Sequence, residues 1–157
     1  MNSKSTLIVL STAFVLLNLG LINVQGNPEL KPYVLKFKDV KAQTKKFISY
    51  YQSIELSPAQ EKIKKRALSA IPAPCCSNYP IATCCCPCNL AKSVWGLSNF
   101  LITKKDYDVG KLKEAVTAWI QYTHPNGFAG DACFQSRCDA AFYNDGCGGM
   151  EEQKIVF

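Results

Sequence analysis

The sequence predicts a small, mainly α-helical domain of about four helices, followed by an irregular C-terminal tail rich in glycine and cysteine. Apolar residues recur at helical spacing in four stretches between residues 35 and 123. Residues 72–89 hold six of the nine cysteines together with four prolines, which does not suit a helix. Five of the nine glycines follow residue 126, where the helical periodicity ends. These three observations define a cysteine-rich helical domain.

Residues 1–26 have the pattern of a secretory signal peptide. Lys4 supplies a positive charge, residues 7–22 form an apolar run, and Gly26 ends a short stretch suited to cleavage. The apolar run is shorter than the roughly 20 residues of a membrane-spanning helix. We therefore expect a secreted or periplasmic protein, in a compartment that oxidises unprotected thiols.

The chain after the signal peptide divides by charge and cysteine content. Residues 27–74 carry ten Lys and Arg against four Asp and Glu, and no cysteine. Residues 75–157 are nearly neutral and contain all nine cysteines. We expect a basic helical N-terminal segment and a cysteine-rich helical module. The basic helices could contact an anionic surface, although a solvated helix face also explains the run 62–66. No nucleic-acid partner is expected.

The first two helices are expected at residues 35–55 and from Ser57 to Ile71. Phe37, Phe47 and Tyr51 belong to the apolar stripe of the first helix. The second has a Ser57 N-cap, with proline next and Gln60 in position for a capping box.

The third helix is expected from Asn89 and the fourth from an N-cap at Asp108. We expect Trp95 and Trp119 to be buried between them, and His124 to lie at the C-terminal end of the fourth helix. Residues 72–89 are expected to form no regular element, and no strand pair is predicted.

The cysteines allow a disulfide framework. Adjacent cysteines pair only through a strained ring, so neighbouring thiols need partners elsewhere. Cys84, Cys85 and Cys86 could reach Cys133, Cys138 and Cys147 and bind the tail to the third helix. Nine is an odd number, so at least one thiol would remain for another chain or a ligand. This hypothesis predicts a disulfide-stabilised structural or interaction module.

The same cysteines also fit a soft-metal site. Four sulfurs lie within five residues, just before a helix N-terminus whose dipole favours thiolates. Sulfur-rich ligation suits Cu(I) and Zn(II). The predicted ligands are Cys84, Cys85, Cys86, Cys88, Cys133, Cys138, Cys147 and Met150.

A third hypothesis is thiol–disulfide exchange. Cys85-Cys86-Pro87-Cys88 fits the pattern Cys-x-Pro-Cys at the start of a helix, and these four residues resemble the thioredoxin active site. The resemblance implies that Cys85 is the nucleophile and Cys88 the resolving thiol.

The residue inventory favours a binding protein over an enzyme. A single histidine, His124, excludes a multi-histidine metal centre within one chain, and no Cys-x-x-Cys-His attaches a c-type haem. We expect no iron–sulfur cluster, because the chain is predicted to be exported unfolded. Binding of Cu(I) or Zn(II) is the leading hypothesis, with a metal ion or an exported protein as partner.

Overall fold

The computed structural model describes residues 35–74, 76–84, 86–125, 140–144 and 146–157, with only the backbone at positions 76 and 77. All of these residues belong to one compact unit, Tyr33–Phe157. The predicted signal peptide lies outside the described residues. No helix within them is long and apolar enough to span a membrane.

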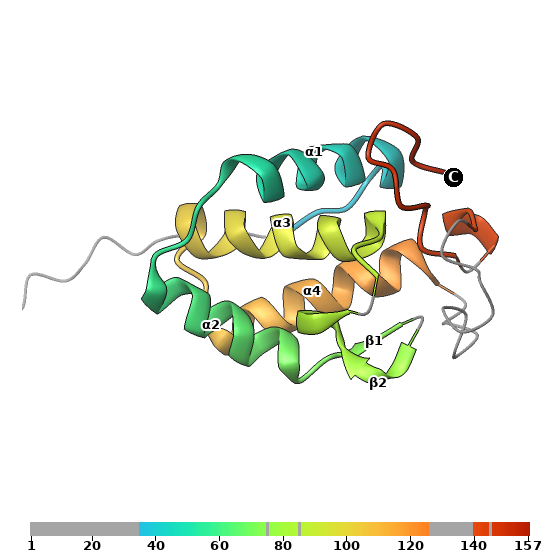
Figure 1. The fold of residues 1–157 in the computed structure, drawn as a ribbon. Helices are drawn as coiled ribbons and strands as arrows, with labels where there is room; N and C mark the ends of the chain where they lie inside the picture. Colours follow the sequence, from blue (N-terminus) through green and yellow to red (C-terminus); the bar gives the residue numbers. More distant parts are fainter. Residues whose placement is uncertain (1–34, 75, 85, 126–139, 145) are drawn as a thin grey trace, which may run out of the picture. The chain divides into compact units, whose positions relative to one another are not determined.

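The described chain is mainly α-helical, as predicted. Its four α-helices are α1 (Val40–Ser53), α2 (Pro58–Ser69), α3 (Asn89–Lys105) and α4 (Val109–Thr123). α1 packs along α3, and α3 and α4 form a helical hairpin, while α2 contacts both members of that hairpin (Figure 1). The hydrophobic core includes residues from all four helices, on both sides of position 74.

Local capping sets where the helices begin. Ser57 and Gln60 form the predicted capping box, and the side chain of Asp108 accepts a hydrogen bond from the amide of Lys111. α1 begins five residues later than predicted, because Asp39 accepts from the amide of Ala42 and acts as the N-cap. Phe37 therefore precedes the helix, but its ring still packs against Trp119 with centroids 5.0 Å apart.

The prediction that residues 72–89 hold no regular element is wrong. β1 (Pro72–Ala73) pairs antiparallel with β2 (Cys76–Pro80), and a single 3-10 turn follows at Ile81–Thr83. Pro72 lies opposite Pro80, and the register is irregular after Pro72. Each strand of a two-stranded sheet has a free edge, so proline can be accommodated without breaking the pairing.

The two tryptophans occupy different environments. Trp119 is fully buried, and its indole Nε1 donates to Ser93 Oγ 3.0 Å away, as expected for a core residue between α3 and α4. The prediction for Trp95 is wrong, because this ring is only half-buried and lies near Tyr51 of α1. Successive residues of an α-helix are rotated by about 100°, so the side chain at position 95 does not share the inward direction of Val94.

Gly96 allows the close approach of α1 to α3. A Cβ atom placed on Gly96 would overlap the backbone carbonyl of Phe47 and crowd the amide of Tyr51. Glycine lowers intrinsic helix stability by about 1 kcal/mol relative to alanine. At this position the absence of a side chain permits the backbone contact on which the α1–α3 packing depends.

The last twelve residues, 146–157, are called here the terminal segment. The Val156 amide donates to the Gly148 carbonyl at 3.0 Å, and the Val156 carbonyl accepts from the Phe142 amide at 3.2 Å. The Phe157 ring stacks on Phe142 and lies 5.4 Å from Lys41 Nζ of α1. Backbone hydrogen bonds and ring contacts thus hold the segment against the helices (Figure 1).

Candidate functional site

The candidate site is the start of α3, where the first cysteine cluster meets the helix. Cys88 is the N-cap residue of α3 and is only 1% exposed. Cys84 and Cys86 are half-buried in the segment leading to it. Cys85, which the thioredoxin resemblance identifies as a nucleophile, lies outside the described residues.

The terminal segment docks onto this helix end through its backbone carbonyls. The Asn89 amide donates to the Gly149 carbonyl at 2.8 Å, and the Leu90 amide donates to the Cys147 carbonyl at 3.1 Å. These amides belong to the first turn, which has no partners within its own helix. Cys147, itself 1% exposed, is therefore held beside the residues that follow Cys88.

Asn89 reinforces the docking with its side chain. Its amide Nδ2 donates to the carbonyls of Gly148 and Glu151, at 2.8 and 2.9 Å. Asn89 is fully buried, so these bonds are shielded from water. The role of Asn89 was not predicted, and its only signal in the sequence is a polar residue directly after the cysteine cluster.

Two glycines shape the turn that presents these carbonyls. Gly148 and Gly149 have φ angles of 74° and 84°, a region that residues with a Cβ atom rarely adopt. At Gly148 a Cβ would also overlap the Phe142 ring. The Cys147-Gly148-Gly149 sequence is therefore suited to this docked turn.

A lysine neutralises the acidic end of the turn. Lys92 Nζ donates to the Met150 carbonyl at 2.9 Å and lies 3.1 Å from Glu152 Oε1. Both side chains are largely buried, with 13% and 22% exposure, so solvent screens this ion pair less than a surface pair. The half-buried side chain of Met150 packs against the core, while its backbone carbonyl accepts the hydrogen bond from Lys92.

His124 anchors the beginning of the terminal segment. It is the C-cap residue of α4, and its Nε2 lies 2.8 Å from the Gly146 carbonyl. Because a carbonyl only accepts hydrogen bonds, this contact places a proton on Nε2. The position at the helix end agrees with the sequence, whereas the connection to the terminal segment was not predicted.

The structure places five of the eight predicted ligands within the described residues: Cys84, Cys86, Cys88, Cys147 and Met150. Cys85, Cys133 and Cys138 lie outside them. Among the described side chains no two cysteine sulfurs are at disulfide-bonding distance, and no three His, Cys, Asp or Glu residues are grouped closely enough to hold a metal ion.

The first two backbone amides of α3 are occupied by the terminal segment. The sequence suggested that the helix dipole favours thiolates, and the structure shows in addition that the first two amides of α3 bind carbonyl oxygens of the terminal segment. The side chain of Cys88 accepts no capping hydrogen bond from the helix.

Comparisons with protein-family models, curated proteins and solved structures find no match for this chain.

Proposed function

We propose that the protein binds a soft metal ion, Cu(I) or Zn(II), through cysteine thiolates gathered at the start of α3. The observation that carries the proposal is the docking of the terminal segment. Its hydrogen bonds to Asn89 and Leu90 hold Cys147 at the same helix end as Cys88. Two cysteines distant in sequence thus approach one place, which is what a shared ligand set requires.

The burial of two cysteines favours metal-bound sulfurs over thiolates with no cation beside them. Cys88 and Cys147 are both 1% exposed, and an ionised thiolate in such surroundings needs a positive charge close to it. A bound cation supplies that charge and is held by the same sulfurs. The remaining ligands in this proposal are the half-buried Cys84 and Cys86, joined by Cys85, Cys133 and Cys138.

Cu(I) is the ion that we favour. Structural Zn(II) sites require four ligands in a tetrahedral arrangement. Cu(I) is soft, prefers sulfur, and can be held by two or three thiolates. No group of three metal-binding side chains occurs among the described residues, so a zinc site would need several cysteines from the rest of the chain.

The alternative is a disulfide-stabilised structural or interaction module that holds no metal. Bridges from the same cysteines would fasten the terminal segment to α3, in a compartment where disulfides persist. This alternative predicts that the oxidised chain is the functional form.

A Cu(I) titration tests the proposal. The reduced full chain competes anaerobically with a chromophoric Cu(I) chelator, and the affinity is compared with that of Cys88→Ser and Cys147→Ser. We expect each variant to lose about tenfold or more in affinity, because each removes a ligand.

The control is Ser57→Ala, which removes the α2 N-cap and about 1 kcal/mol of stability but no thiol. It should bind Cu(I) as the wild type does. The proposal fails if the wild type takes up no Cu(I), or if both cysteine variants bind it unchanged.

A further inference from the structure

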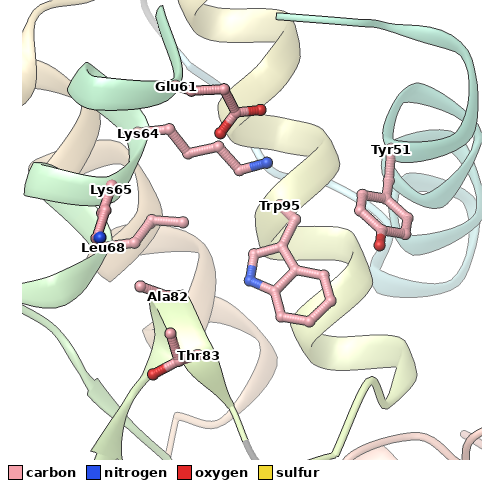
Figure 2. A pocket seen from close by; sticks show the side chains of 8 residues that line it. All are labelled: Tyr51, Glu61, Lys64, Lys65, Leu68, Ala82, Thr83 and Trp95. Carbon is pink, nitrogen blue, oxygen red and sulfur yellow. The ribbon is translucent and has the colours of Figure 1, made fainter. Parts of the chain in front are cut away.

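A pocket separate from the cysteine site lies between α1, α2, α3 and the 3-10 turn at Ile81–Thr83. Its volume is about 330 Å³, within the range of small-molecule sites. Figure 2 shows its lining, with Lys64 on α2 extending towards Trp95 on α3 and Tyr51 of α1 on the opposite side. None of the predicted metal ligands that the structure describes lines it.

One wall of the pocket is aromatic and fixed in place. The indole Nε1 of Trp95 donates to the Ile81 carbonyl at 2.9 Å, which sets the plane of the ring. The Tyr51 ring lies 5.4 Å from it, centroid to centroid, and the buried Leu68 continues the apolar surface. A half-buried tryptophan held in this way offers a flat face to a planar ligand.

The polar part of the pocket is positively charged. Lys64 is half-buried, and within the described residues its ammonium makes no hydrogen bond or ion pair. Burial lowers the pKa of Lys64, and Glu61, one turn away, opposes this effect by favouring the charged form. Lys65 also lines the pocket, so the acidic and basic side chains among the described lining residues are two lysines and one glutamate.

We propose that this pocket binds a small, flat organic carboxylate, with the ring against Trp95 and the carboxylate on Lys64 Nζ. Such a ligand would stack on the aromatic face of Trp95 and form an ion pair with the Lys64 ammonium. The exposed Thr83 hydroxyl at the same rim can donate a further hydrogen bond. One water occupies about 30 Å³ of liquid, so the pocket holds about a dozen non-hydrogen atoms, the size of a two-ring carboxylate.

The test compares ligands of one shape and different charge. Calorimetry of the full chain at neutral pH measures binding of 2-naphthoate and of 2-naphthamide, its neutral counterpart. We expect the carboxylate to bind at least about tenfold more tightly, because a charge-assisted hydrogen bond is stronger than a neutral one. Lys64→Gln should remove this preference while leaving the weaker binding of the amide, and Trp95→Leu should weaken both ligands.

Lys62→Gln is the matched control, because it removes the same charge from an exposed position on α2 outside the pocket. The helical signal in the far-ultraviolet circular dichroism spectrum shows whether each variant is folded. The proposal is overturned if naphthoate does not bind at millimolar concentration, if the amide binds equally well, or if Lys62→Gln and Lys64→Gln have the same effect. Loss of Cu(I) binding in cysteine variants leaves this result unaffected.

Discussion

The backbone amide of Leu90 donates a hydrogen bond to the carbonyl of Cys147, 3.1 Å away and 57 positions further along the chain. This bond, with its neighbour from Asn89 to Gly149, joins the two cysteine-bearing regions. The two bonds provide acceptors for amides of the first helical turn, which have no partner within the helix. The terminal segment thus caps the N-terminus of α3 and holds Cys147 beside it.

Replacing Asn89 by leucine should loosen the terminal segment. The variant keeps a similar side-chain volume but loses the two hydrogen bonds that Asn89 Nδ2 donates to the Gly148 and Glu151 carbonyls. We expect a loss of about 1–3 kcal/mol in the free energy of unfolding, measured with urea. Asn78→Leu changes an exposed asparagine in the same way and should stay close to wild type. Equal stability of the two variants would show that the side chain of Asn89 does not hold the segment.

Gly96→Ala tests the backbone contact between α1 and α3. The added methyl group overlaps the Phe47 carbonyl, so the helices must separate, and we expect a loss of about 3 kcal/mol or more. Gly110→Ala in the first turn of α4 adds the same group where only Asp108 Oδ1 lies near, at 3.4 Å. That control should be neutral or gain up to about 1 kcal/mol from helix propensity. The midpoint of thermal unfolding should therefore fall for Gly96→Ala and stay unchanged or rise for Gly110→Ala.

The two tryptophans should differ in their contribution to stability. Trp119→Ala removes a fully buried ring and leaves Ser93 Oγ without its indole donor, so we expect a loss of about 3–5 kcal/mol. Trp95→Ala removes a half-buried ring at a pocket wall and should cost clearly less. Chemical denaturation measures both. A larger loss at Trp95 than at Trp119 would contradict the core described above.

Lys64 should make the free energy of unfolding vary with pH in the alkaline range. Burial lowers the pKa of Lys64 in the folded chain below its ordinary value of 10.5. Between these two values the unfolded chain binds a proton that the folded chain has lost, so the free energy of unfolding rises with pH across this window. The measurement is urea unfolding of wild type and Lys64→Gln from pH 7 to 10.5. The wild type should gain stability relative to the variant as pH increases, and a constant or falling difference would refute this prediction.

The helices could be predicted because their signals are local. The capping box at Ser57 and Gln60 and the N-cap at Asp108 involve residues three positions apart, so the sequence contains both partners. The start of α1 was missed because Asp39 caps the helix inside a stretch whose apolar spacing extends further back. The β1–β2 pairing was missed because prolines usually interrupt strands, although a two-stranded sheet tolerates them at its edges.

The arrangement of the candidate site was harder to predict. The terminal segment docks through backbone carbonyls, which every residue possesses, so no side-chain pattern marks the contact with Asn89 and Leu90. Periodicity identified the apolar stripes of α3 and α4 but did not show that Trp119 of α4 faces the core while Trp95 of α3 faces the pocket. The pocket itself depends on three helices meeting, and this cannot be inferred from any one of them.

The intact mass of the chain purified from its own compartment decides between metal binding and a disulfide framework. The mass is recorded first under native conditions, and again after chelation, denaturation without reductant, and alkylation. If the chain binds a metal, we expect a native mass that includes a copper or zinc ion, and alkylation of most of the nine cysteines after chelation. A native mass without metal, eight protons below that of the reduced chain and with a single alkylated cysteine, would contradict metal binding and establish the disulfide-stabilised module instead.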